Sequence, residues 1–158
     1  MIEVKPVDHH DPAMAAAIHA VQMAAYTQEA RLLGARQFPP LERTVRDIQI
    51  STENYFAAFD NKILVGVVSL GPGEDPKVKN IASLVVTPAR QREGIANLLL
   101  QMVLEQYGAG PITVQTAAKN LPALELYAKF GFVECKRWSV GAEALELVRL
   151  HHPGTSKK

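Results

Sequence analysis

Hydrophobic residues follow two different spacings along the chain, and each spacing predicts a different kind of element. Apolar positions 14, 18, 21 and 25 recur at the spacing of one helix face, and a second such stripe runs over residues 94–107. Short apolar runs bounded by turn residues, at 55–59 and 63–70, are typical of strands. The whole pattern predicts a strand, two helices, three strands, a helix, a strand, a helix and two final strands.

Capping and turn residues predict where these elements begin and end. Asp11, followed by a proline, is typical of a helix N-terminus, and this helix is expected to run to Leu33 with a glycine closing it. The spacing of Thr44 and Asp47 is that of a capping box at the start of a short helix. We expect strands at 2–7, 55–59, 63–70, 81–86, 111–117, 132–140 and 144–150, and helices at 12–33, 45–50, 94–107 and 121–130.

The strand–helix–strand stretch over residues 81–117 determines the expected fold class. A helical crossover joins its two strands, and such a crossover is right-handed and places the strands parallel to each other. We therefore predict a single α/β domain over residues 1–152, built on a mixed sheet of about six to seven strands flanked by helices. Residues 153–158 are polar and are expected to form a disordered tail.

Composition and charge exclude several classes of protein. Of the 158 residues, 47% are apolar and 21% are charged, values typical of a soluble globular domain. The formal net charge of +1 argues against a nucleic-acid partner, and no apolar run approaches the ~18 residues of a membrane span. We expect a cytoplasmic protein without membrane contact, because the N-terminus lacks the pattern of a signal peptide and a single cysteine excludes an internal disulfide.

Several residues invite a functional interpretation that their surroundings do not support. The five histidines occur without Asp, Glu or Cys at ligand spacing, so we predict no metal site. Cys135 and Trp138 fall in a predicted strand, where we expect a buried, unreactive thiol and a core indole. The last two strands are also where we expect the contact of a homodimer, if the protein self-associates.

The segment from Val85 to Ala96 carries the strongest functional pattern. A buried strand ends there, a short loop brings Arg90 and Arg92, and a helix begins at Gly94. The first turn of a helix leaves backbone N–H groups unpaired and concentrates partial positive charge, so a phosphate group can bind there. On these residues alone, an anion site and an ordinary strand–helix junction both stay open.

Two motifs around this loop resemble those of a known family. The spacing Gln91-x-x-Gly94-x-Ala96 resembles the acetyl-CoA motif, Q/R-x-x-G-x-G/A, of the GCN5-related N-acetyltransferases (GNAT). The family's second motif has an asparagine that opens a helix and a tyrosine before a Gly-Phe pair. Its counterpart here reads Asn120-x-x-Ala123-x-x-x-Tyr127-x-Lys129-x-Gly131-Phe132. The resemblance implies the GNAT fold, in which the two central parallel strands, here 81–86 and 112–116, splay apart.

The resemblance implies that acetyl-CoA binds as cosubstrate at this loop. In such enzymes the CoA pyrophosphate lies on backbone amides of the loop and the first helical turn. On this chain those amides belong to Gln91, Arg92, Glu93, Gly94, Ile95 and Ala96, with Asn97 just behind them. Arg90 or Arg92 is expected to meet the 3′-phosphate.

The pantetheine arm is implied to run beside the strand that precedes the loop. It is expected to pair, like an added strand, with the backbone of Val85, Val86 and Thr87, because an extended amide chain can bond an unpaired strand edge. Asn120 is expected to contact the same arm.

The resemblance also implies a reaction, the transfer of acetyl from acetyl-CoA to a primary amine of a small molecule or a peptide. The amine would attack directly in a ternary complex. The backbone N–H of Val86 would donate to the thioester oxygen as negative charge develops on it, and Tyr127 matches the family's acid for the departing thiolate. Four residues fall where the family lines its acceptor groove, although ordinary helix surface explains them equally well: Tyr26, Glu29, Arg31 and Phe38.

The pattern contains no obvious proton acceptor for the amine. Many members carry a glutamate on the strand before the loop, whereas residues 80–87 include no carboxylate. Three alternatives stay open: a water held by Asn80 or Ser83, a carboxylate from Glu29 or Glu42, or an amine that needs no base. The missing carboxylate also keeps a rival function open, a CoA-binding module or sensor with little or no turnover.

Overall fold

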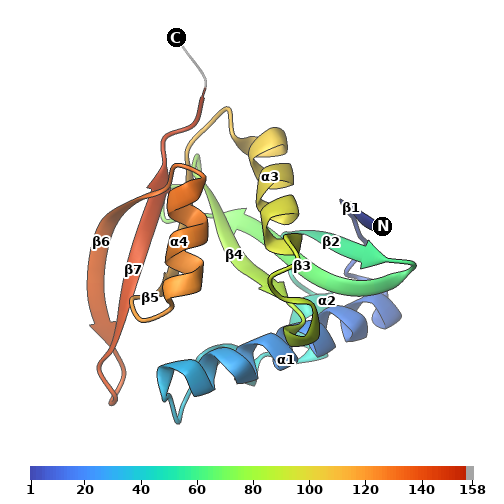
Figure 1. Ribbon diagram of the computed structural model, residues 1–158, viewed down its shortest axis with the longest axis horizontal. Coiled ribbons are helices and arrows are strands. Elements are labelled where there is room, and N and C mark those ends of the chain that lie inside the picture. Colours follow the sequence, from blue (N-terminus) through green and yellow to red (C-terminus); the bar gives the residue numbers. More distant parts are fainter. Residues whose placement is uncertain (156–158) are drawn as a thin grey trace.

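Seven strands and four α-helices make up residues 1–155, the part of the chain that the computed structural model describes (Figure 1). The strands are β1 (Ile2–Pro6), β2 (Asn54–Asp60), β3 (Ile63–Pro72), β4 (Lys79–Val86), β5 (Ile112–Ala117), β6 (Val133–Val140) and β7 (Leu145–His152). The helices are α1 (Pro12–Leu33), α2 (Val45–Gln49), α3 (Ile95–Tyr107) and α4 (Leu121–Lys129), with short 3₁₀ turns η1 (Pro39–Glu42) and η2 (Pro88–Arg90). The predicted order of elements is confirmed.

The strands form one mixed sheet in the order β1-β2-β3-β4-β5-β7-β6, in which only β4 and β5 are parallel. This confirms the predicted α/β class and the parallel central pair. The caps are also those expected. The Asp11 carboxylate accepts from the Met14 N–H at 3.0 Å, and Thr44 and Asp47 exchange both bonds of a capping box.

Helices cover both faces of the sheet (Figure 1). α1 and α2 lie on one face, where Ile18 and Val21 pack against β2, β3 and β4. α3 and α4 lie on the other face and contribute Leu99, Val103 and Tyr127 to the largest core cluster. At the centre of the molecule the sheet therefore lies between two hydrophobic cores, one beneath α1 and one beneath α3.

The central parallel strands separate soon after they meet. β4 and β5 are paired at three positions only, the last of them Ile81 with Val114. Immediately beyond this pair, the β3–β4 register shifts, because Ser69 faces Ser83 while Leu70 faces Ile81. The extra residue in β4 is a β-bulge, which bends its strand and increases the local twist. β4 therefore turns away from β5, as the resemblance predicted, while β5 stays paired with β7 along its whole length.

Two predictions for β6 are wrong. Cys135 is exposed, at a register shift between Glu134 and Lys136, and Trp138 is only partly buried. The physical reason is the position of β6 as the edge strand of the sheet, where most residues stay open to solvent. A strand pattern by itself does not reveal whether the strand lies at the edge or at the centre.

The predicted tail lies partly outside the described residues. Its first residues run beside the end of α3, where the Thr155 N–H donates to the Gly108 carbonyl at 2.8 Å. The prediction of disorder for residues 156–158 concerns residues that the structure does not describe. Within residues 1–155, no helix has the length and apolar character needed to cross a membrane, and no three His, Cys, Asp or Glu side chains gather to hold a metal ion.

Candidate active site

The N-terminus of α3 differs from those of the other α-helices in the described chain. Asp11, Thr44 and Asn120 each cap their helix with a side-chain oxygen, whereas no side chain caps α3 at Gly94. The first intrahelical bond of α3 runs from Leu98 to Gly94, so the N–H groups before Leu98 have no partner within the helix. These unpaired donors and the helix dipole make a site for an anion.

The backbone before α3 is shaped to expose these donors. Gly94 has φ 83° and Arg92 has φ 68°, both in the left-handed region. Such a conformation turns successive N–H groups toward one concave side and is typical of anion-binding nests. A Cβ added at Gly94 would meet no atom within 4 Å, so the space in front of the helix end is open. The residues present therefore fit a phosphate group.

The basic residues around this anion site at the start of α3 are not equivalent. The Arg90 guanidinium is held by Asp60 at 2.9 Å and by Glu93 at 2.8 Å. Arg92 is exposed, and it is the better placed of the two expected arginines to meet a phosphate. Lys129, on α4, reaches the first turn of α3, where its ammonium donates to the Asn97 carboxamide at 2.8 Å.

A cavity of about 360 Å³ occupies the space where β4 and β5 part. We call it the gap cavity; Tyr26, Glu29, Ser83, Thr116, Asn120 and Tyr127 are among the residues that line it. The N–H of Thr87 donates to the Val65 carbonyl on β3 at 2.9 Å. Because backbone groups alternate in direction along a strand, the N–H and C=O of Val86 point away from β3, toward the gap.

Gln91 connects the loop to the end of β4. Its side-chain amide donates to the Val86 carbonyl at 3.3 Å and to the Gln28 side chain on α1 at 2.7 Å. Gln91 therefore links the end of β4 and the loop to α1, on the α1 side of the anion site.

Glu29 is the one carboxylate among the described residues that line the gap cavity. Burial raises the pKa of this carboxyl, and the nearby Asn120 side chain opposes the shift. Burial also raises the pKa of Tyr127, and the negative charge of Glu29 adds to that shift. The cavity therefore holds a carboxylate of raised basicity and a phenol that keeps its proton at neutral pH.

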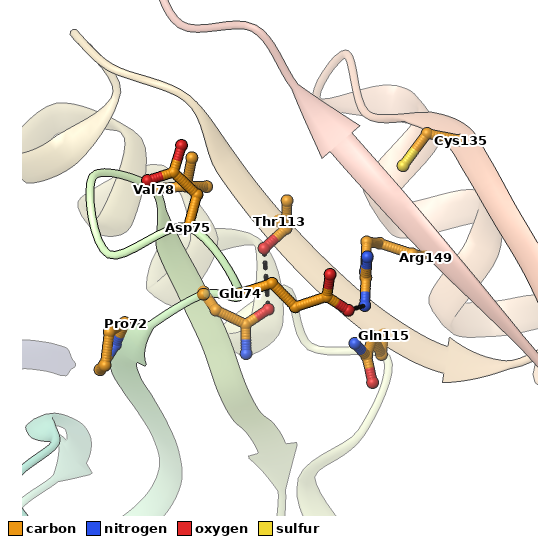
Figure 2. Close-up of a pocket in the computed structure, with 10 residues that line it drawn as sticks. Pro72, Glu74, Asp75, Val78, Thr113, Gln115, Cys135 and Arg149 are labelled. Carbon is orange, nitrogen blue, oxygen red and sulfur yellow. Dashed lines mark hydrogen bonds and ion pairs between the residues drawn. The ribbon is translucent and has the colours of Figure 1, made fainter.

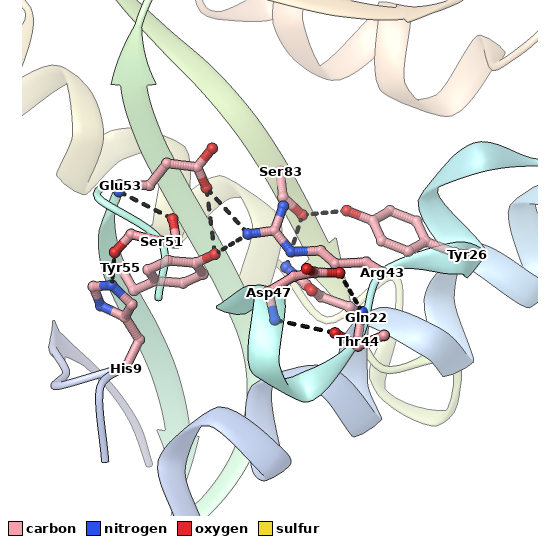
Figure 3. Close-up of polar contacts among 10 residues, drawn as sticks. All are labelled: His9, Gln22, Tyr26, Arg43, Thr44, Asp47, Ser51, Glu53, Tyr55 and Ser83. Carbon is pink, nitrogen blue, oxygen red and sulfur yellow. Dashed lines mark hydrogen bonds and ion pairs between the residues drawn. The ribbon is translucent and has the colours of Figure 1, made fainter. Parts of the chain in front are cut away.

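Ser83 and Asn80, the two expected water holders, are engaged within the protein. The Ser83 hydroxyl lies 2.6 Å from the Tyr26 hydroxyl and accepts from the Gln22 amide at 3.4 Å (Figure 3). The Asn80 carbonyl oxygen accepts from the Thr113 hydroxyl at 2.9 Å. Glu42 does not line the cavity.

Comparison with known proteins places this site in a family. The model of the Acetyltransferase (GNAT) family matches residues 17–132, which include most of α1, the β4–β5 gap and both motifs. The chain belongs to the GNAT acetyltransferase family. A relative, UPF0157 protein YqkA of Bacillus subtilis (strain 168), is 37% identical over 127 residues, which are 80% of this chain. The GNAT chain spans 36% of the length of that relative.

Solved structures share the fold of this GNAT chain over nearly its whole length. The ribosomal-protein-S18-alanine N-acetyltransferase of Escherichia coli superposes with a TM-score of 0.75 at 16% identity, covering 100% of this chain and 97% of its own. YncA of Salmonella typhimurium, solved with its cofactor acetyl-CoA, superposes with a TM-score of 0.74 at 16% identity. The match covers 100% of this chain and 96% of YncA. At these identities the likeness concerns the fold.

A second polar cluster fixes the connection between α1 and α2 in the GNAT chain. Arg43 donates to the Tyr55 hydroxyl at 2.7 Å and pairs with Glu53 at 3.6 Å, close to the start of the α2 helix (Figure 3). Burial raises the pKa of Tyr55 to about 12. This cluster anchors the chain just after η1, whose Pro39 and Pro40 form part of the cavity wall.

The tertiary structure brings the residues expected from the sequence into two adjoining groups. The first surrounds the start of α3 and consists of Gln91, Arg92, Glu93, Gly94, Ile95, Ala96 and Asn97. The second consists of Val85 and Val86 at the end of β4, Thr87 just after it, and Asn120 and Tyr127, of which only Asn120 and Tyr127 line the gap cavity. Two of these contribute little through their side chains, because Val85 packs beneath α1 and Glu93 turns to Arg90.

Sequence reasoning did not identify Gln28 or Lys129 as site residues. Both reach the loop from elements distant in the sequence, α1 and α4. The motif around Tyr127 includes Lys129, but nothing in that pattern indicates that the side chain crosses to Asn97. Of the expected groove residues, Tyr26, Glu29 and Phe38 line the cavity and Arg31 does not.

Proposed function

We propose that this GNAT chain is an N-acetyltransferase that moves acetyl from acetyl-CoA to a primary amine of a small molecule or peptide. The observation that carries the proposal is the opening of the β4–β5 gap beside an uncapped helix N-terminus, with Glu29 and Tyr127 in the same gap. The N-acetyltransferase and the acetyl-CoA complex among the similar structures support it.

Acetyl-CoA, when bound, supplies the acetyl group as a thioester. The N–H groups around Gly94 would hold its pyrophosphate, with Arg92 and Lys129 at the rim. The strand end from Val85 to Thr87, together with Asn120, would hold the pantetheine arm. The Val86 N–H would donate to the thioester oxygen as negative charge develops on it.

The proposed proton transfers use two side chains of the gap cavity. Glu29 is the acceptor for the proton of the incoming amine, because burial raises the pKa of its carboxyl and so makes the carboxylate a stronger base. Tyr127 keeps its proton at neutral pH and would give it to the departing thiolate. The amine can then attack directly within a ternary complex, without a covalent enzyme intermediate.

Replacing Glu29 by glutamine is expected to lower kcat/KM by about a hundredfold at pH 7. As the pH decreases, wild-type activity should fall for two reasons, because both the amine and the Glu29 carboxylate become protonated. At pH values below the raised pKa of Glu29, the slope of log kcat/KM against pH should therefore drop from about two in the wild type to about one in the variant. Glu42→Gln, at a carboxylate outside the gap cavity, serves as the control. Equal pH profiles for E29Q and wild type would remove Glu29 as the base.

Removing the 3′-phosphate of CoA is expected to weaken binding by about fivefold to tenfold, the loss of one partly exposed charge pair. Calorimetric titration with CoA and 3′-dephospho-CoA measures this difference. In Arg92→Gln the two ligands should bind alike, whereas Arg137→Gln, on the distant β6, should keep the wild-type difference. A difference that survives in R92Q would assign the 3′-phosphate to another cation.

Screening primary amines for acetyl-CoA-dependent release of CoA thiol tests the proposed function itself. Turnover with at least one amine supports the transferase. The rival reading, a CoA-binding module or sensor, predicts calorimetric binding of acetyl-CoA with no amine-dependent release. If no CoA derivative binds, both functions are wrong and the loop is an ordinary strand–helix junction.

A further inference from the structure

A second cavity, of about 440 Å³, opens on the α1 face of the sheet next to the gap cavity (Figure 2). We call it the hairpin pocket; Glu74, Asn80, Thr113, Gln115, Cys135 and Arg149 are among the residues that line it. Asn80 and Gln115 also line the gap cavity, so the two spaces adjoin at the point where β4 and β5 separate. A molecule with one end in the gap cavity can therefore extend into the hairpin pocket.

The positive charge in the hairpin pocket is held rigidly. The Arg149 side chain, on β7, is only 16% exposed, and its guanidinium lies 5.6 Å from the centre of the Trp138 ring. The Lys136 ammonium lies 5.1 Å from the same ring and adds a second positive charge. A cation within about 6 Å of an indole ring is attracted to the face of that ring, which favours one position of the largely buried Arg149 side chain.

The negative partner of Arg149 is held much less firmly. The Glu74 carboxylate accepts from the guanidinium at 2.5 Å, but its side chain is 70% exposed and stands on the connection between β3 and β4 (Figure 2). This connection, residues 73–78, contains Gly73 and Pro76 and follows Gly71 and Pro72 at the end of β3. An ion pair with so exposed a partner contributes little to stability. Another carboxylate can replace Glu74 at small cost, because one charge-assisted pair is exchanged for a similar one.

The opposite assignment, a cation held by the loop carboxylates, fits the geometry less well. The Asp75 carboxylate already accepts from the Lys77 N–H at 2.9 Å within the loop, and Glu74 faces Arg149. The group that packing fixes in place is the guanidinium. The pocket therefore favours an anionic occupant, and the bond from Glu74 demonstrates that a carboxylate fits there.

We propose that the hairpin pocket binds a carboxylate of the acceptor through Arg149, with Glu74 occupying that position until the acceptor arrives. The occupant is thus an amine that carries a carboxylate on the far side of its reacting nitrogen. Calling the occupant the acceptor rests on the proposed function, whereas the preference of the pocket for an anion does not.

Cys135 allows the charge of the pocket to be measured without any turnover. It is the single cysteine of the chain, it is exposed and it lines the pocket. We would compare its rates of modification by 2-sulfonatoethyl and 2-(trimethylammonium)ethyl methanethiosulfonate, each normalised to a small free thiol. Arg149→Gln should lower the anion-to-cation rate ratio by about fivefold, and Glu74→Gln should raise it by a similar factor. Arg137→Gln, whose guanidinium pairs with Glu134 and Glu146, is the control and should change it little.

Acceptor preference provides the second measurement. The probes are ω-amino acids of increasing chain length, each matched with the n-alkylamine of the same length, and the readout is CoA release. The wild type should favour one length of ω-amino acid over its alkylamine by at least about tenfold in kcat/KM, the strength of one charge-assisted contact. R149Q should lose this preference, and R137Q should keep it.

The outcomes separate the two proposals. If alkylamines and ω-amino acids of every length are acetylated equally well, the transferase stands and the carboxylate pocket is wrong. If no amine is acetylated, the proposed function fails, and the rates at Cys135 alone decide the pocket. Rate ratios that respond neither to R149Q nor to E74Q would overturn the proposal whatever the kinetics.

Discussion

Replacing Gly94 by valine is expected to weaken acetyl-CoA binding by about a hundredfold or more. The backbone at this position has φ 83°, which disfavours a β-branched residue, and valine would add bulk beside the unpaired N–H groups at the start of α3. Two lost charge-assisted hydrogen bonds are worth roughly 3 kcal/mol, which corresponds to about two orders of magnitude in Kd. Calorimetric titration with acetyl-CoA measures the change.

The control must carry the same backbone strain at another place. Gly141, in the turn between β6 and β7, has φ 74° and no atom within 4 Å of an added Cβ. Both Gly94→Val and Gly141→Val should therefore lose a similar ~1–2 kcal/mol of stability from the left-handed backbone. Only G94V should lose acetyl-CoA. If both variants bind acetyl-CoA as the wild type does, the N-terminus of α3 is not the pyrophosphate site.

Replacing Tyr127 by phenylalanine is expected to lower kcat by about a hundredfold while leaving the Kd of acetyl-CoA unchanged. The Tyr127 ring is buried and packs edge-on against the Phe132 ring, with 5.4 Å between the two ring centroids. Phenylalanine at position 127 keeps this packing. The hydroxyl that the variant loses belongs to a residue lining the gap cavity, and its raised pKa keeps it protonated up to alkaline pH. Only the proton donor is removed.

Tyr107→Phe is the matched control for this variant. That tyrosine is on α3, away from the gap cavity, and its hydroxyl accepts from the Asn54 amide at 3.3 Å. Its loss should change kcat little, and both variants should unfold at temperatures near that of the wild type. Equal kcat for Y127F and wild type, with an amine found by the screen, would leave Tyr127 as a packing residue.

Local patterns in the sequence determined the elements and indicated the candidate cofactor loop. The spacing of apolar residues indicated each helix and strand, and Asp11 and Thr44 marked helix starts, because capping bonds join residues three apart. The loop before Gly94 was singled out as a candidate anion site in the same way, since phosphate binding at a helix N-terminus uses consecutive backbone amides, and its resemblance to the family motif indicated acetyl-CoA. All of these features depend on neighbours in the chain.

The tertiary structure alone decided which distant residues meet. The bulge opposite Ser69 sends β4 away from β5 and opens the gap, and the crossing of α1 brings Glu29 into it. Arg90 is bound to Asp60, thirty positions earlier, and Arg149 is bound to Glu74. Periodicity reports which face of an element is buried, but not which element packs against that face or whether a strand lies at the edge. The exposure of Cys135, the candidate base and the hairpin pocket all depend on that packing, and so only the tertiary structure decided them.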